Sequence, residues 1–281
     1  MAIDKDLIRQ PELWQLVMEI APDRLSALAF CPLEDHSLQL MDAPLPADDG
    51  DGAAGTLKGL ENVVYDNPGL LAGFGMTTVL WRSRRMAIMP GFVTGDDTAL
   101  EVLRRQFPED DAAAPAQVLS DRWEMLDVRL EYEVPSAMAA FVRRTFDNPR
   151  MHHSLTPAAF WFASRHGVRG GGKTLVNIGH RAMDVYVLGD RAPLLVNSFE
   201  CPVIEDALYY LLAVRRALGL RDSDEVFMAG DRGRRVALTA LLRRYVSYVM
   251  PAIFPAEMFR AGKEVLSAPF ELAIAPVALR R

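Results

Sequence analysis

The chain has 281 residues, of which 50% are hydrophobic and 24% are charged, which is typical of a globular protein and excludes a disordered, collagenous or disulfide-built one. Its 31 basic and 37 acidic side chains give a net charge of −6, which argues against binding nucleic acid by neutralising phosphates. No stretch approaches the ~18 consecutive apolar residues that span a bilayer, and the charged start MAIDKDLIRQ lacks the apolar run of a signal peptide. We therefore expect a cytoplasmic protein with no membrane span.

The first part of the chain predicts a three-stranded meander, because three short apolar runs are separated by the turn-forming sequences APDR and PLED. In the helix that follows, Leu57, Leu60 and Val64 share one face, and Pro68 ends it. Two strands and a second helix complete this part. The expected elements are strands 13–20, 25–30 and 36–41, a helix ending near 67, strands 76–80 and 85–89, and a helix from about 98 to 107.

The middle of the chain contains the clearest strand. Residues 108–121 are acidic and rich in Pro and Ala, so we interpret them as a boundary loop that separates residues 1–121 from residues 122–281. After this loop, apolar residues alternate with charged ones over residues 126–134, as in a strand with one buried face. Helices are predicted to start at Pro135 and around Thr156.

The last part predicts a second meander, again with tight turns between its strands. A long amphipathic helix follows it, and Gly219 is placed to end that helix. The expected elements are strands 174–178, 182–188 and 193–199, a helix of about 204–218, a strand 225–228, a helix carrying residues 238–249 on one face, and a last strand 270–274.

The two parts share one order of elements. In each, three antiparallel strands are followed by a helix and a further strand, and the second set lies about 150 to 160 residues after the first. A meander followed by a crossover helix and a parallel strand forms a mixed sheet with helices on its faces. The sequence thus predicts an α/β fold made of two related halves.

One stretch carries a resemblance to a known family. The run TLVNIGHRAMDVYVLGDRAPLLVNSFECPVIEDALYYLLAVRRALGL, followed by VFMAGD, resembles an uncharacterised bacterial family of unknown function that has the actin-like ATPase fold of actin, Hsp70 and sugar kinases. The likeness covers nearly the whole chain, is most specific between Leu126 and Tyr245, and extends to the pilus-assembly and cell-division proteins PilM and FtsA. It implies two ribonuclease H-like subdomains with a nucleotide cleft between them.

The resemblance also implies where a nucleotide would bind. Working members hold phosphates with Asp-x-Gly hairpin turns, one in each half, in which the acidic side chain handles Mg²⁺ and the glycine lets backbone N–H groups approach. The matching positions in the second half are Asn177, Gly179 and Asp184, joined by Gly230 and Asp231 at the adenosine strand. These five residues are the expected cofactor-binding residues.

The turns depart from the pattern of the working members. Asn177 carries no charge, and one glycine of the adenosine pair is missing. In the first half the turn reads EIAPD (residues 19–23), where Ala21 replaces the glycine and Pro22 removes a backbone donor. We therefore expect degenerate phosphate loops and no catalytic residues. We do not expect ATP with Mg²⁺ to be a regular cofactor.

A second glycine-rich motif matches a phosphate-binding loop in sequence but not in the order of its neighbouring elements. Residues 167–174, GVRGGGKT, fit the P-loop pattern G-x-x-x-x-G-K-[ST]. A P-loop needs a strand before it and a helix after it, so that the helix N-terminus meets the phosphates. Here the expected order is reversed, which favours a glycine connector.

Three functions follow as alternatives. The first is a non-catalytic interaction or scaffold module whose partner is another protein. The second is an ATPase or small-molecule phosphotransferase in which Asp184, Asp231 or Asp23 supplies the carboxylate. The third is an RNA-associated protein, suggested by Arg-Arg pairs such as Arg215-Arg216 and Arg243-Arg244. The five histidines show no ligand spacing, so no metal site is expected, and the two cysteines, Cys31 and Cys201, are expected to be buried thiols.

Overall fold

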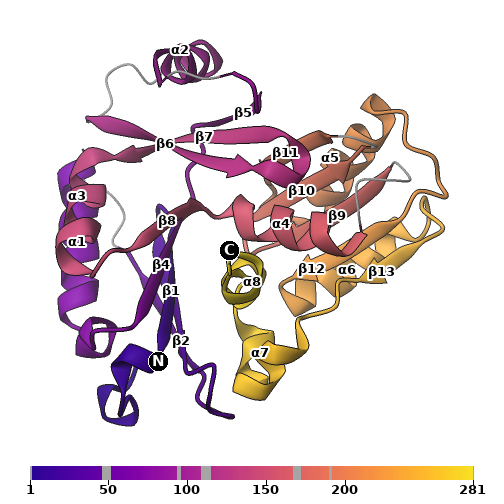
Figure 1. Ribbon diagram of the computed structural model, residues 1–281. Helices are drawn as coiled ribbons and strands as arrows, with labels where there is room; N and C mark the ends of the chain where they lie inside the picture. The colour runs from indigo at the N-terminus through magenta and orange to yellow at the C-terminus, as the bar shows by residue number, and fades with distance from the viewer. Residues whose placement is uncertain are drawn as a thin grey trace. The chain divides into compact units, whose positions relative to one another are not determined.

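The computed structural model describes residues 2–45, 52–93, 96–108, 115–166, 172–189 and 192–280. It divides into two compact units that are not contiguous in sequence (Figure 1). Unit 1 consists of Met1–Trp123, Val128–Pro157 and Pro255–Arg281, and unit 2 of Glu124–Asp127 and Ala158–Phe254. The chain therefore returns to unit 1 after completing unit 2.

The main sheet of unit 1 has the strand order β3-β2-β1-β4-β8. β1 pairs with β2 in antiparallel fashion and with β4 in parallel, and β4 is parallel to β8. The strands are β1 (Gln15–Ile20), β2 (Arg24–Phe30), β3 (Gln39–Pro44), β4 (Met76–Trp81) and β8 (Arg150–His153). The carboxyl ends of β1, β4 and β8 meet at one edge of this sheet, which is where open α/β sheets bind ligands.

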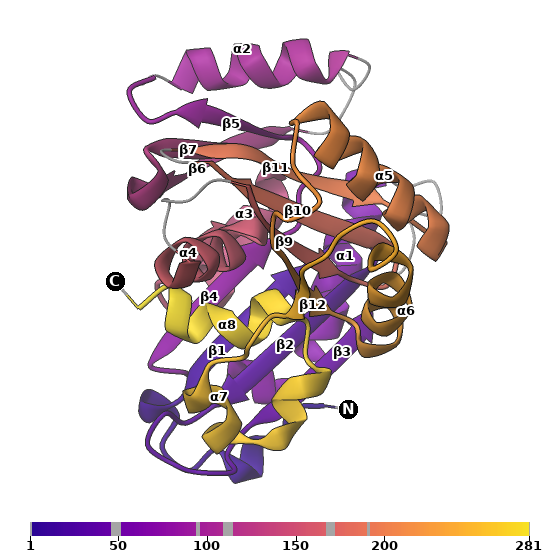
Figure 2. The same cartoon turned by 90° about the vertical axis from the view of Figure 1, so that its right-hand side faces the viewer.

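Helices cover both faces of this sheet. α8 (Phe270–Ala278) packs on β1, where Leu272 and Ala275 join Val17 and Leu80 in one apolar cluster. Figures 1 and 2 both show α8 against this strand. On the other side lie α1 (Gly52–Tyr65) and α3 (Ser136–Thr145), which contact each other.

Unit 1 also contains a second, antiparallel sheet of order β5-β7-β6. Its strands are β5 (Met86–Pro90), β6 (Ala116–Trp123) and β7 (Val128–Pro135), and α2 (Asp96–Gln106) packs on β5 and β6. The strand predicted from the alternation of residues 126–134 is β7, which begins two residues later at Val128 because Leu126 ends a short helical turn. The loop interpretation of residues 108–121 is wrong from Ala116 onward, because those residues pair along the whole length of β7. Only Asp121 and Trp123 of β6 are buried, so this edge strand lacks an apolar pattern.

Unit 2 is built on one sheet of order β11-β10-β9-β12-β13. α5 (Ile204–Ala217) and α6 (Arg232–Leu242) pack on one face through a large apolar cluster, and α4 (Leu155–His166) brings Phe162 against Phe227 of β12. The strands are β9 (Lys173–Ile178), β10 (Ala182–Leu188), β11 (Pro193–Glu200), β12 (Val226–Gly230) and β13 (Val249–Pro251).

The two main sheets have the same topology. In each, a three-stranded meander is followed by two strands parallel to its first strand, in the spatial order third, second, first, fourth, fifth. The α/β fold with two ribonuclease H-like subdomains, each a meander with crossover helices on a mixed sheet, is thereby confirmed.

Two elements near the C-terminus differ from the sequence prediction. Residues 270–274 form helix α8 rather than a strand. The sequence prediction failed because all seven residues from Phe270 to Pro276 are buried, so the helix shows no polar face that would reveal its period. The predicted helix through Val249 ends at Leu242, and Val249 begins β13. Shorter helices complete the chain: η1 (Lys5–Leu7), η2 (Pro11–Leu13), η3 (Pro68–Leu71), η5 (Glu124–Leu126), α7 (Ala256–Ala261) and η6 (Lys263–Ser267). Among the described residues, every helix is too short or too polar to cross a bilayer.

Candidate functional site

The β9–β10 hairpin of unit 2 brings two of the predicted residues face to face. Asn177 and Asp184 are register partners on neighbouring strands, both are buried, and the Asn177 amide nitrogen lies 3.4 Å from a carboxylate oxygen of Asp184. The turn between them is closed by the Gly179 N–H, which donates to the carbonyl of Ala182 at 2.8 Å. The hairpin therefore holds one buried carboxylate beside a neutral amide.

The end of β12 completes this edge. Gly230 is the register partner of Ile178 and has φ +95°, and a Cβ placed on it would lie 2.1 Å from the Ile178 carbonyl oxygen, so no other residue fits without moving a strand. The next residue, Asp231, donates its N–H to the same carbonyl at 2.7 Å. All five predicted residues thus gather at the carboxyl edge of the unit 2 sheet.

Asp231 has a structural task at this edge. Its side chain caps α6 by accepting the N–H of Arg234 at 2.8 Å. The guanidinium of Arg234 in turn donates to the main-chain carbonyls of His180 and Cys201, which tie the hairpin turn to the segment before α5. Sequence reasoning missed Arg234, although its position three residues after a capping Asp is a recognisable signal.

Unit 1 has an equivalent edge with different side chains. By register, Glu19 faces Ser26 as Asn177 faces Asp184. The Ala21 N–H closes the turn on Arg24 at 3.0 Å, at the place of the Gly179 contact. The main-chain N–H of Arg82 donates to the Ile20 carbonyl at 2.9 Å, as Asp231 does to Ile178. The basic residue Arg82 therefore follows β4 in unit 1 at the position where the acidic residue Asp231 follows β12 in unit 2.

That cation forms a buried ion cluster. The Arg82 Nε lies 2.7 Å from a carboxylate oxygen of Glu19, and an Nη of Arg82 pairs with Glu271 on α8. The two carboxylate side chains are 5% and 7% exposed. The turn carboxylate of unit 1 is thus neutralised within the chain. No local pattern in the sequence indicates this pairing, because Arg82 and Glu271 are 189 positions apart.

Beside this cluster, buried polar groups fix the end of β8. The carboxylate of Asp121 accepts the His153 N–H at 2.8 Å and the Thr156 hydroxyl, and contacts the His152 ring at 3.0 Å. The His153 Nε2 lies 2.9 Å from the Ser83 carbonyl, which only accepts, so Nε2 carries the proton. Burial lowers the pKa of His153 to about 4, and nearby Arg82 acts in the same direction, against the Ser83 contact and Asp121. His153 is therefore neutral at pH 7.

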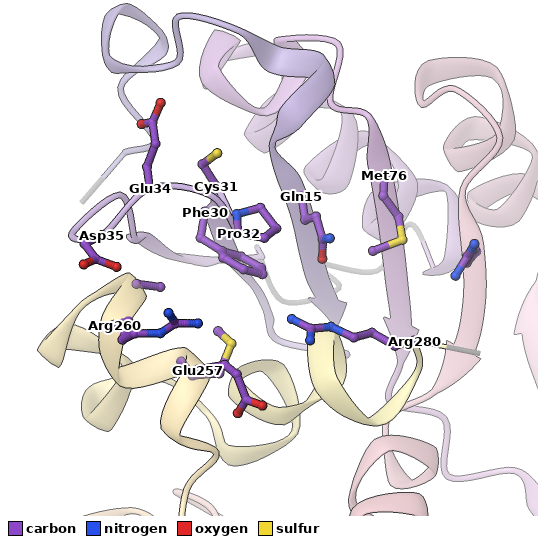
Figure 3. Close-up of a pocket in the computed structure, with 13 residues that line it drawn as sticks. Gln15, Phe30, Cys31, Pro32, Glu34, Asp35, Met76, Glu257, Arg260 and Arg280 are labelled. Atoms are coloured by element: carbon purple, nitrogen blue, oxygen red, sulfur yellow. The ribbon is translucent and has the colours of Figure 1, made fainter.

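A pocket of about 490 Å³ lies at the opposite, amino edge of the unit 1 sheet (Figure 3). Its apolar lining includes Phe30 and Met258, which are buried, and the Oε1 of Gln15 is a buried acceptor with no hydrogen-bond partner in the described part of the chain. Six charged side chains complete the lining: Glu34, Asp35, Arg150, Glu257, Arg260 and Arg280. The loop before β3 is held to α7 by hydrogen bonds from His36 and Leu38 to the carbonyls of Arg260 and Ala261.

The P-loop-like sequence has the element order that excludes a P-loop. α4 ends at His166, and Lys173 begins strand β9, so no helix follows the lysine. Residues 167–171 lie outside the described residues. Cys31 and Cys201 are buried free thiols, as predicted. Across the described ranges, His, Cys, Asp and Glu side chains form no group of three that could hold a metal ion.

Comparisons with known proteins agree with this architecture. A family model described as a protein of unknown function (DUF3822) matches residues 4–249. A crystal structure from Bacteroides thetaiotaomicron, described as a protein with actin-like ATPase fold and unknown function, has a TM-score of 0.73 at 19% identity over 92% of this chain and 97% of that one. The PilM-PilN type IV pilus biogenesis complex matches with a TM-score of 0.53 at 15% identity over 95% of this chain and 98% of that one. None of the curated proteins matches in sequence. The predicted actin-like ATPase fold and the likeness to PilM are confirmed.

Proposed function

The chain belongs to the DUF3822 family, and we propose that it uses the actin-like ATPase fold as a non-catalytic module that docks another protein. The observation that carries this proposal is the ion cluster in unit 1. Glu19 is the acidic group at the turn position where working members handle Mg²⁺, and its carboxylate is paired with Arg82. A guanidinium at this edge opposes a cation.

The turns in both units support the same proposal. Pro22 supplies no N–H to the turn of unit 1, and Asn177 brings no charge to the hairpin of unit 2. Asp231 caps α6, and Arg234 is engaged with main-chain carbonyls. The degenerate loops thus keep the fold but not the chemistry that holds Mg²⁺ and triphosphate.

Titration calorimetry of the full chain with ATP and Mg²⁺ tests the absence of a working nucleotide site. We expect no binding in the micromolar range and no phosphate release. Micromolar binding with turnover would overturn the proposal in favour of an ATPase or phosphotransferase. In that case Asp184→Asn should abolish phosphate release, because Asp184 is the buried carboxylate of the hairpin.

The pocket of unit 1 is the place where we propose that the partner docks. Its lining combines apolar side chains, which a partner can cover, with charged side chains of both signs, which can select a partner of complementary charge. Within the described residues, the six charged side chains that line it make no ion pair with one another. The unpartnered Gln15 acceptor would suit a peptide N–H. A complex of the fold neighbour PilM with PilN is consistent with a protein partner.

A charge exchange tests this docking site. Glu257→Lys with Arg260→Glu reverses two charges of the pocket, while Arg24→Asp with Asp42→Arg exchanges an exposed ion pair elsewhere in unit 1 and serves as the control. In co-purification at mild salt, a protein retained by the wild type and the control should be lost from the pocket variant. Equal retention by all three chains would contradict the assignment.

The cytoplasmic location stays a prediction.

A further inference from the structure

Three arginines from two Arg-Arg pairs that are distant in sequence line one hollow of unit 2. Arg215 and Arg216 lie in the last turn of α5, and Arg244 follows the end of α6. They line a hollow of about 370 Å³ at the amino edge of the sheet, away from the hairpin turns. The other lining residues are Leu212, Leu220, Asp222 and Tyr245.

The charges of this hollow are unbalanced. Three guanidinium groups face a single carboxylate, Asp222, which leaves a local charge of about +2. In the described part of the chain, the side chains of Arg216 and Arg244 make no hydrogen bond or ion pair. Like charges held together repel one another, and a bound anion would relieve this repulsion.

Arg215 gives the hollow a rigid, buried member. It is only 4% exposed, and its Nη2 donates to the carbonyls of Arg221 at 2.5 Å and Asp224 at 3.5 Å. Its Nη1 is buried and has no hydrogen-bond partner among the described residues. Burial lowers the pKa of Arg215, against the opposing effect of Asp224 and Asp222. A buried charged donor without an acceptor lowers the stability of the fold, and a bound acceptor would remove this cost.

The helix dipole does not account for this arrangement. Basic residues in a last helical turn are favoured by the C-terminal dipole, and α3 also ends with an Arg-Arg pair, Arg143-Arg144. There, however, Arg143 donates to Gln117 at 3.1 Å. The dipole explains neither the unpartnered nitrogen of Arg215 nor Arg244, which lies beyond its helix.

We propose that this hollow binds a phosphate monoester. A monoester carries nearly two negative charges at pH 7 and three acceptor oxygens, which matches the charge of the hollow and its three arginines better than a single carboxylate does. Arg216 and Arg244 contact the phosphate, the unpartnered Nη1 of Arg215 donates to one of its oxygens, and the Tyr245 hydroxyl is a further donor. Leu212 and Leu220 supply an apolar wall for the organic part of the ligand.

The test measures binding of phenyl phosphate to the full chain by calorimetry at fixed ionic strength. The variant Arg216→Gln/Arg244→Gln removes two exposed charges without opening the core, and Arg143→Gln/Arg144→Gln removes an equal charge from the end of α3. We expect the first variant to lose at least about tenfold in affinity, as the loss of charge-assisted hydrogen bonds requires. The α3 variant should bind as the wild type does.

Three results would overturn the proposal: no binding of phenyl phosphate at millimolar concentration, equal affinity in the two double variants, or equal affinity for benzoate. A second arm identifies the source of the monoester. Sedimentation with phosphatidylcholine vesicles containing phosphatidic acid, but not with phosphatidylcholine alone, would support a lipid headgroup. Binding of phenyl phosphate without sedimentation would support a small soluble ligand. The Arg216→Gln/Arg244→Gln variant separates the two sites in the ATP titration, because it changes the hollow and leaves the hairpin edge intact.

Discussion

The carboxyl edges of the two sheets share their backbone hydrogen bonds and differ in their side chains. After β4 the chain places Arg82 between two buried carboxylates, whereas β12 ends at Gly230 and is followed by the helix cap Asp231. In both units the next main-chain N–H bonds to the carbonyl at the end of the first strand. The difference teaches that the duplicated backbone tolerates opposite charges at one position, provided that each charge has a partner.

The largest effect is expected from removing the cation of unit 1. Arg82→Met leaves Glu19 and Glu271 buried without their guanidinium, which should lower the free energy of unfolding by about 3–5 kcal/mol. Chemical denaturation measures this loss. Arg24→Met, which breaks an ion pair whose side chains are 42% and 55% exposed, is the control and should cost less than about 1 kcal/mol. The triple variant Glu19→Gln/Arg82→Met/Glu271→Gln should recover part of the loss, and an Arg82→Met chain as stable as the control would refute the cluster's role.

The glycine of unit 2 should give the next largest effect. Gly230→Ala places a Cβ against the Ile178 carbonyl at a positive φ, which should destabilise the protein by about 3 kcal/mol. Gly233→Ala, three residues later in the first turn of α6, meets only a side-chain oxygen at 3.5 Å and should be neutral or slightly stabilising. The equivalent of Gly230 in unit 1 is Trp81, an ordinary strand residue. Similar melting temperatures for the two variants would show that this turn is less constrained than its geometry indicates.

The smallest of the three effects concerns pH and belongs to unit 1. The folded-state pKa of His153, about 4, is below the ordinary 6.5, so protons bind preferentially to the unfolded chain. Stability is therefore lost as pH falls from about 6.5 to 4, and His153 contributes a loss of about 2 kcal/mol between pH 7 and pH 5. His153→Gln should flatten the dependence by that amount relative to the wild type. His180→Gln, at the exposed turn of unit 2, is the matched control, and parallel pH curves for wild type and His153→Gln would contradict the prediction.

Most elements of the fold could be predicted because their signals are local. Alternation marks β7, Pro and Gly end α1 and α5, and turn sequences separate the strands of both meanders. Elements that are stabilised by residues distant in the sequence could not be predicted in this way. β6 is a polar edge strand held by pairing with β7, and α8 is buried on all sides and so lacks the polar stripe that distinguishes a helix.

The candidate site divides in the same way. The resemblance to the actin-like ATPase family led to Asn177, Gly179, Asp184, Gly230 and Asp231, because these positions match turns along the sequence, and the structure gathers them at one edge of the sheet. The resemblance to the actin-like family supplied their expected role, which stays a proposal. It did not lead to Arg234 or to the pairing of Arg82 with Glu271.

The sequence by itself determined the duplicated order of strands and helices, since hydrophobic period and turn residues act over a few neighbours along the chain. Only the tertiary structure decided which charges lie together: α8 brings Glu271 to Arg82, and the ends of α5 and α6 bring three arginines to one hollow. The physical reason is that ion pairing and burial depend on distance in space, which the order of residues does not specify until the sheets are assembled.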